Sequence, residues 1–308
     1  MAFGLKPEES LRKSVRRIAR KEMDYAQAQV TKTANGTREA AVHEARKSGK
    51  KLRALLRLVR PAISARTYRK ENTALRDAAR PLTEVRDAKV LIDTLDKLGQ
   101  HFATRVRGRP FAPIRKELMA YKREVRTRVL DKEHGFAVVE TAIRDALARL
   151  DDWTAVPNRW SSVGHGVRQV YRQARRALAE ARAEPTVEHL HEWRKHVKYL
   201  RYQLTVLQPL WPEGMAPLVE QADHLGELLG EDHDLAVLRQ MLAVEPERFG
   251  GEDARALLLA LIDSRRKELE EEAMLLGQRL FQDPPPVFAR RLKGYWTVWC
   301  QLREQTET

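Results

Sequence analysis

The sequence has little from which a disulfide, a zinc cluster or a membrane span could be built. Its 308 residues include a single cysteine, Cys300, which excludes an intrachain disulfide and any multi-cysteine zinc site. No apolar run approaches the roughly 20 residues that a transmembrane helix needs. Residues 1–6 also lack the apolar stretch of a signal peptide. We therefore expect a cytoplasmic protein that does not use a membrane as its partner.

Aromatic residues are scarce as well, at 6% of the chain, whereas charged residues make up 32%. Ala, Leu, Arg and Glu dominate, and this mixture favours helix over strand. Between the prolines, apolar residues recur at helical spacing with almost no alternating strand pattern. Pro81 should kink or split the third of the predicted helices. These helices are expected near residues 8–31, 37–60, 65–98, 111–148, 160–183, 186–208, 215–243 and 252–281, with a further segment near 287–303.

The charge of the chain is strongly unbalanced. Lys and Arg number 57 against 43 Asp and Glu, a formal net charge of +14. Such an excess attracts polyanions, which include nucleic acid, anionic membrane and polymeric phosphate.

One segment of the sequence occurs twice in the chain. Residues 43–61 recur at 191–209 with nine of 19 positions identical, where chance gives about one. A second match aligns Leu82, Glu84 and Asp87 with Leu229, Glu231 and Asp234. Weaker matches pair Val15-Arg16-x-x-x-Arg20 with Val167-Arg168-x-x-x-Arg172, and Lys122-Arg123 with Arg265-Arg266.

Four matches in the same order imply two copies of one helical unit. The seam falls near residues 151–158, which divides the chain into halves of about 1–152 and 153–308. We expect an all-α fold in which two four-helix bundles are related by an internal pseudo-two-fold repeat. Together the halves form one domain over residues 1–308.

The best-matched helix in each half carries a stripe of cations. At about 100° per residue, the cations of the first copy fall within about 80° of His43, and leucines such as Leu52 and Leu56 lie opposite. Like charges three and four positions apart repel on a helix. A duplicated stripe that works against helix stability indicates an anion site rather than a solvated face. The stripes consist of His43, Arg46, Lys47, Lys50, Arg53 and Arg57, and of His191, Arg194, Lys195, Lys198 and Arg201.

Further cations lie on one face of other predicted helices and extend the candidate site. Taken alone, each of these sets is equally compatible with an ordinary surface face. They are Arg12, Arg16 and Arg20 in the first helix, Arg168, Arg172 and Arg175 in the fifth, and Lys122, Arg126 and Arg265 around the weakest match.

The duplicated histidines, His43 and His191, have three possible uses. They could bind metal, make structural hydrogen bonds or donate to an anion. Metal binding normally requires two histidines four residues apart or carboxylates on the same face, and neither pattern is present. The acidic segment 229–234 keeps only two of its acids in the other copy, which favours helix packing or salt bridges there. The other histidines have no duplicated partner, so we expect ordinary polar positions for them.

The two copies, His43-x-x-Arg46-Lys47-x-x-Lys50-x-x-Arg53 and His191-x-x-Arg194-Lys195-x-x-Lys198-x-x-Arg201, resemble the CHAD family, the conserved histidine α-helical domain. The resemblance covers residues 10–280 approximately. It implies two helical bundles with a basic channel between them that holds inorganic polyphosphate, with a possible location at polyphosphate granules. Gly49 departs from the repeat, because its counterpart is Val197.

Physical chemistry is consistent with that implication. Polyphosphate has no bases to stack, so its receptor needs Arg and Lys donors but no recognition aromatics. A single-strand nucleic-acid binder would interleave aromatics with the cations, and a helical RNA- or DNA-binding protein is the main alternative. A metal-binding histidine protein ranks behind it.

An enzyme is not expected. The chain has no Gly-x-x-x-x-Gly-Lys phosphate loop and no Glu-x-Glu-x-Lys of the triphosphate tunnel enzymes that accompany some CHAD-like domains. It has no recognisable Ser-His-Asp or Cys-His set either. We expect no cofactor and no resident metal.

Overall fold

The computed structural model describes residues 3–31, 38–106, 108, 110–249 and 251–306. Within this part of the chain there are twelve α-helices and no strand, which confirms the all-α prediction. The helices are α1 (Leu11–Thr31), α2 (Arg38–Leu58), α3 (Ala65–Ala78), α4 (Thr83–His101), α5 (Ala112–Arg126), α6 (Gly135–Ala148), α7 (Asp151–Thr154), α8 (Gly164–Ala183), α9 (Val187–Leu207), α10 (Pro212–Val244), α11 (Glu252–Leu280) and α12 (Pro285–Thr306).

The helices form where apolar residues recur every three or four positions. In α1, for example, Leu11, Val15 and Ile18 are buried, and their spacing gives the helix one apolar face. Side chains also define some of the helix starts. Ser64 and Thr186 precede α3 and α9, and each hydroxyl accepts a hydrogen bond from a backbone N–H of the first turn, which satisfies a donor without an intrahelical partner.

The predicted split at Pro81 is confirmed, since α3 ends at Ala78 and α4 begins at Thr83. In the second half Leu228 stands at the matching position, and α10 runs unbroken for 33 residues. Proline lacks the N–H that would continue a helix, which favours the break at Pro81, although α10 accommodates Pro217 inside the helix without a break.

The prediction of a single helix over 111–148 is wrong. α5 ends at Arg126, residues 127–132 form a π-helical turn, and His134 adopts a left-handed conformation with φ of 51° before α6 begins. A left-handed residue cannot continue a right-handed helix, so the chain changes direction there. The predicted start of a helix at residue 37 lies outside the described residues.

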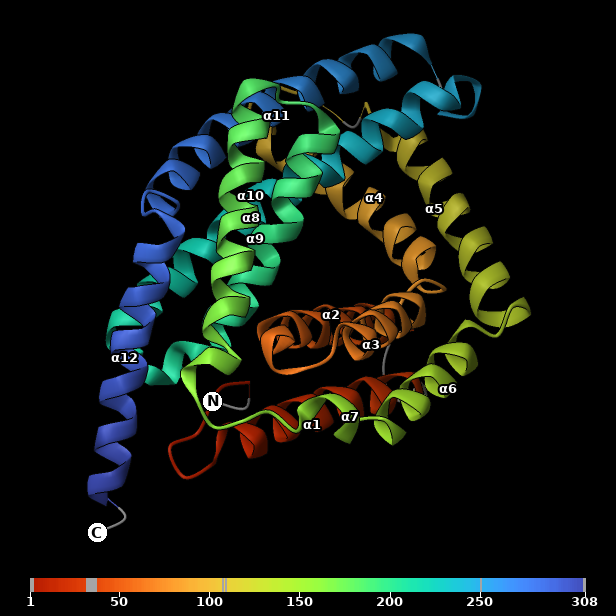
Figure 1. Cartoon of the computed structure of the whole chain (residues 1–308). Coiled ribbons are helices and arrows are strands. Elements are labelled where there is room, and N and C mark those ends of the chain that lie inside the picture. Colours follow the sequence, from red (N-terminus) through yellow and green to blue (C-terminus); the bar gives the residue numbers. More distant parts are fainter. Residues whose placement is uncertain (1–2, 32–37, 107, 109, 250, 307–308) are drawn as a thin grey trace.

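Corresponding helices of the two halves pack on corresponding partners (Figure 1). α1 packs on α2 and α6, as α8 packs on α9 and α12, while α4 packs on α5 as α10 packs on α11. Between the halves α2 contacts α9 and α4 contacts α10. This order agrees with the duplicated sequence motifs. The pseudo-two-fold relation and the boundaries at 1–152 and 153–308 remain predictions.

The joint between the halves is close. A Cβ atom on Gly166 of α8 would lie 2.0 Å from the carbonyl oxygen of Leu58 at the end of α2. Only glycine therefore permits this approach. Beside it, the buried Gln203 of α9 donates a hydrogen bond of 3.2 Å to the carbonyl oxygen of Ala54 in α2.

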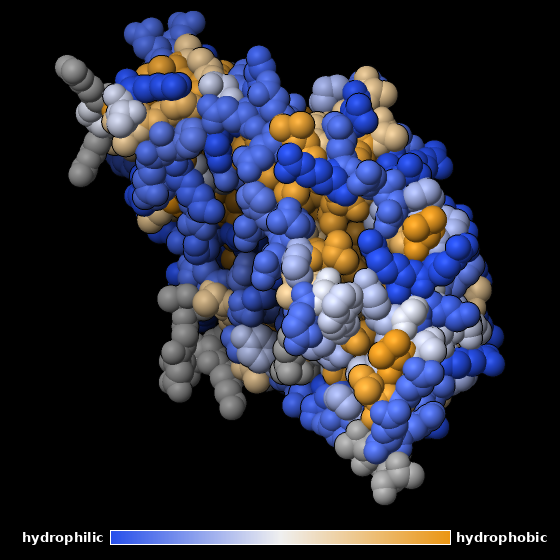
Figure 2. Space-filling model, turned by 90° about the vertical axis from the view of Figure 1, so that its left-hand side faces the viewer, coloured by the Kyte–Doolittle hydropathy of each residue, from blue (hydrophilic) through white to orange (hydrophobic). Residues whose placement is uncertain are grey.

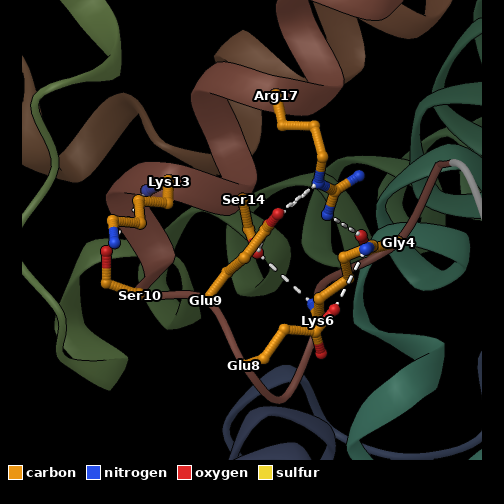
Figure 3. A network of polar contacts seen from close by, with 8 residues as sticks. All are labelled: Gly4, Lys6, Glu8, Glu9, Ser10, Lys13, Ser14 and Arg17. Carbon is orange, nitrogen blue, oxygen red and sulfur yellow. Dashed lines mark hydrogen bonds and ion pairs between the residues drawn. The ribbon is translucent and has the colours of Figure 1, made fainter.

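The segment that precedes α1 also connects the halves. Arg17 holds it on α1, donating to the Glu9 carboxylate at 2.8 Å and to the Gly4 carbonyl at 2.8 Å (Figure 3). Leu5 is buried, and its N–H donates to the carbonyl of Val206 at the end of α9. The first residues of one half are thus fixed on the last turn of a helix from the other.

The outer surface carries apolar residues as separate spots among hydrophilic side chains, at least on the face that presents α12 (Figure 2). Val298 and Leu302 of α12 belong to the exposed apolar residues. None of the described helices has the length and apolar character required to cross a bilayer.

The leucines predicted to lie opposite the cations are core residues, with Leu52 3% and Leu200 0% exposed. We expect Leu200→Ala to lower the free energy of unfolding by about 2–5 kcal/mol, through lost burial and the cavity left behind. Val244→Ala is the control, because Val244 is 69% exposed, and it should cost about 0.5 kcal/mol or less. Urea denaturation measures both. Equal effects would contradict the assignment of α9's apolar face to the core.

Candidate functional site

A cavity of about 900 Å³ lies among α2, α4, α9 and α10. Each half contributes two helices to its walls. Basic, acidic and histidine side chains line it together. Its polar lining consists of His43, Arg46, Lys47, Lys50, Thr83, Arg86, Asp87, Thr94, Lys97, His191, Arg194, Lys198, Arg201, Tyr202, Asp223, Glu227, Glu231, His233 and Asp234.

The two predicted cationic stripes meet at this cavity. Eight of the residues predicted from the sequence line it, four from each half: His43, Arg46, Lys47 and Lys50 from α2, and His191, Arg194, Lys198 and Arg201 from α9. Helical spacing places them on one face of each helix, and the packing of α2 on α9 turns both faces to the same space. Their role in binding remains a prediction.

Three residues of the stripes do not line this cavity. Arg53 and Arg57 both donate to the side-chain oxygen of Asn72 in α3, at 3.2 and 2.9 Å, and the Arg57 guanidinium lies 4.0 Å from the ring centre of Tyr199. Lys195 pairs with Glu192 on its own helix. These side chains are held elsewhere by local partners.

The cations of the first and fifth predicted helices lie on the outer surface. Arg12, Arg16 and Arg20 are exposed on α1, and Arg16 pairs with Asp151. Arg168, Arg172 and Arg175 are exposed on α8. The last two line a separate groove of about 590 Å³ between α8 and the end of α11.

The remaining predicted cations sit near the cavity without lining it. Lys122 of α5 lies 3.3 Å from Glu39 at the start of α2, and Arg126 is exposed one turn further on. Arg265 of α11 pairs at 2.7 Å with Glu231, which itself lines the cavity. That pair, and Glu84 with Arg128 in the first half, confirm the salt-bridging interpretation of the second repeated motif.

Sequence reasoning missed the cavity residues of α4 and α10. Arg86 and Lys97 of α4 and His233 of α10 face the same space as the predicted stripes. His233 occupies the position that matches Arg86, counted from the Leu82 and Leu229 match. The spacing of Thr83, Arg86, Val90, Thr94 and Lys97 follows one helical face and could have indicated this wall, but the face mixes charged, polar and apolar residues.

The repeated arginines differ in how their donors are used. Arg46 donates to the carbonyl of Ala79 at 3.2 Å and to the hydroxyl of Thr83. At the position matching Thr83, the second half has Gly230, which offers no hydroxyl. A Cβ there would lie 3.7 Å from Arg194 Nε. That buried Nε has no hydrogen-bond partner, and a carboxylate oxygen of Asp234 lies 3.9 Å from the guanidinium.

Burial in the cavity favours the uncharged form of its histidines. Burial, and then nearby cations, lower the pKa of His43 and His191, and they lower the pKa of His233 to about 3. The Nδ1 atoms of His191 and His233 are 3.3 Å apart, so one ring donates and the other accepts. Within the described residues no group of three His, Cys, Asp or Glu side chains could hold a metal ion.

The cavity lysines hold their protons less tightly than free lysine. Burial, followed by the repulsion of Arg194, lowers the pKa of Lys50 to about 8 and that of Lys198 to about 7. The walls of the cavity surround both side chains without closing over them, since Lys50 as a whole residue remains exposed and Lys198 half-buried. The cavity therefore concentrates positive potential, and an anion inside it would favour the protonated lysines.

These features define a helical protein with a cation-lined cavity between two similarly packed halves. The family model for the CHAD domain matches residues 17–243, which is most of the chain, and the chain therefore belongs to the CHAD family.

A solved structure agrees at the level of fold. The chain is similar to PptA from Streptomyces chartreusis, with a TM-score of 0.53, 15% identity and coverage of 86% of this chain and 99% of that one. It is also similar to the CHAD domain from the plant Ricinus communis, with a TM-score of 0.45, 17% identity and coverage of 87% and 94%. No curated protein matches the sequence.

The lowered pKa of Lys198 makes stability depend on pH. In the unfolded chain the pKa of this lysine is near 10.5, so between pH 7 and 10.5 the unfolded state holds a proton that the folded state has lost. Below pH 7 both states are protonated, and the folded state bears the full cost of the buried charge. The destabilisation by Lys198 is therefore greatest below pH 7 and fades as the pH rises. We expect Lys198→Met to be more stable than wild type at about pH 6, with an advantage that shrinks towards about pH 10. Urea denaturation at both pH values tests this. An equal difference at both would contradict the lowered pKa.

Proposed function

We propose that the protein binds inorganic polyphosphate, without catalysis, in the cavity among α2, α4, α9 and α10. The observation that carries the proposal is that duplicated cations of both halves face one cavity, where Arg194 Nε is buried without a hydrogen-bond partner. An unsatisfied buried donor is costly. A phosphate oxygen would satisfy it.

The chemistry of the lining suits a phosphate chain. Arginine forms forked contacts to phosphate oxygens and lysine provides point charges. Protonation of Lys50 and Lys198 on binding would add charge where it is needed. The carboxylates would hold the arginines in place in the empty cavity, as Asp223 holds Arg201 at 2.8 Å.

Nucleic acid is the alternative partner. Proteins that bind a single strand combine a basic groove with aromatic side chains on which the bases stack. Apart from the histidines, the aromatic residue in the cavity lining is Tyr202, which is 7% exposed and packs edge-on against Phe3. That ring offers no face for stacking, which favours polyphosphate. We further propose a location in the cytoplasm, at polyphosphate granules.

Reversing cavity charges tests the site. We expect Lys50→Glu and Lys198→Glu each to weaken polyphosphate binding about tenfold, and the double variant about 100-fold or more, because each removes a charged contact and adds a repulsive one. Titration of purified protein with polyphosphate measures the affinity. Lys195 belongs to the second stripe but lies outside the cavity, so it is not among the residues changed in this test.

The matched control carries the same change of net charge on the outer surface. Lys267→Glu with Lys293→Glu alters two exposed lysines of α11 and α12. This variant should change affinity by about twofold or less, because salt screens the long-range interaction of exposed charges with the ligand. Melting temperature and helicity are checked for every variant. An unchanged affinity in a folded double cavity variant would refute the proposed site.

Competition distinguishes the two polyanions. With chelator present throughout, long-chain polyphosphate should displace single-stranded RNA at equal phosphate concentration, and its affinity should fall steeply with salt as counterions are released. RNA that displaces polyphosphate would favour the nucleic-acid alternative. Binding that disappears with chelator would indicate a metal-dependent site.

A further inference from the structure

A second cavity, of about 530 Å³, adjoins the central one on the side of the first half. Arg46, Lys50 and Thr83 line both cavities. The second is also strongly basic, and its rim is open to solvent because Arg76, Asp77 and Arg80 are exposed. Its lining consists of Arg46, Gly49, Lys50, Arg53, Leu75, Arg76, Asp77, Ala79, Arg80 and Thr83.

Gly49 keeps this second cavity open. A Cβ atom there would be 3.8 Å from the Cβ of Ala79, so a larger side chain would extend into the gap between α2 and the end of α3. The matching residue of the second half, Val197, is fully buried. Its methyl group Cγ1 would lie 3.8 Å from a Cβ on Gly226, and that space is filled.

The charges at matching positions are opposite. Counted back from the Leu82 and Leu229 match, Arg76 and Arg80 correspond to Asp223 and Glu227. The first half therefore has cations where the second half has carboxylates. Because Asp223 is already paired with Arg201, the net excess of positive charge at these positions lies on the first-half side, which attracts a polyanion.

We propose that a long polyphosphate leaves the central cavity on the first-half side, passes Gly49, and binds an outer subsite made by Arg53, Arg76 and Arg80. This inference rests on the proposed function. Part of the subsite is already ordered, since Asn72 fixes Arg53. Arg76 is paired with Asp77 at 2.8 Å, an exposed pair that phosphate can replace, because such pairs contribute little to stability.

Comparing the affinities for short and long polyphosphate tests for such a subsite. Arg76→Glu with Arg80→Glu gives the first half the charges of the second, and Gly49→Val gives it the second half's side chain. Both variants should bind tripolyphosphate within about twofold of wild type, because it fits in the central cavity, and should bind long-chain polyphosphate about tenfold more weakly. Isothermal titration with both ligands provides the measurement.

The Lys267→Glu, Lys293→Glu variant serves again as the control of equal charge, and it should keep the wild-type ratio of long-chain to tripolyphosphate affinity. The arginine variant leaves the core untouched, so it gives an answer even if Gly49→Val is unstable. Long-chain affinity that stays unchanged, or falls equally for both ligands, overturns the outer subsite alone. A wild-type protein without affinity for either ligand overturns the proposed function and the subsite with it.

Discussion

The packing of α2 against α9 is the constraint on which the site depends, because it brings two cationic helix faces together. Repulsion between like charges costs a few tenths of a kcal/mol for each pair on a helix. On the opposite faces Leu56, Leu200 and Leu204 are fully buried, and each such side chain contributes about 1.5–3 kcal/mol. The free energy gained by burying these leucines exceeds the cost of the repulsion, so packing of the core can keep the like charges close together.

Acidic residues from α4 and α10 make that arrangement tolerable. Asp223 pairs with Arg201, and Asp234 lies near Arg194. They come from other helices than the cations, which explains why the stripes look unopposed in the sequence. The compensation is incomplete, since Arg194 Nε remains without a partner and Lys198 has a pKa of about 7. An anion that binds in this cavity is stabilised, because it supplies the negative charge that the surrounding carboxylates do not fully provide.

The sequence predicted the all-α fold from local periodicity, and the cations of α2 and α9 from the duplicated motif that carries them. It could not predict which part of a stripe faces the cavity. Arg53 lies on the same broad arc as Lys50, yet Asn72 of α3 holds it away from the central cavity. The cavity residues Arg86 and His233 were missed for a related reason. Their helices mix charged and apolar residues, and only the tertiary packing selects the face that is used.

The repeat itself has diverged at the cavity, and this has a consequence for a polymeric ligand. Thr83 and Gly230, Arg86 and His233, and Gly49 and Val197 are matching pairs with different chemistry. Polyphosphate is the same from either end, so a fully symmetric site would offer it two equivalent ways out. The walls are unequal: the half with Gly49 has a second, basic cavity beside the central one, and the matching positions of the other half hold the buried Val197 and carboxylates. A duplicated scaffold can in this way hold a symmetric polymer and still present it to solvent on one side.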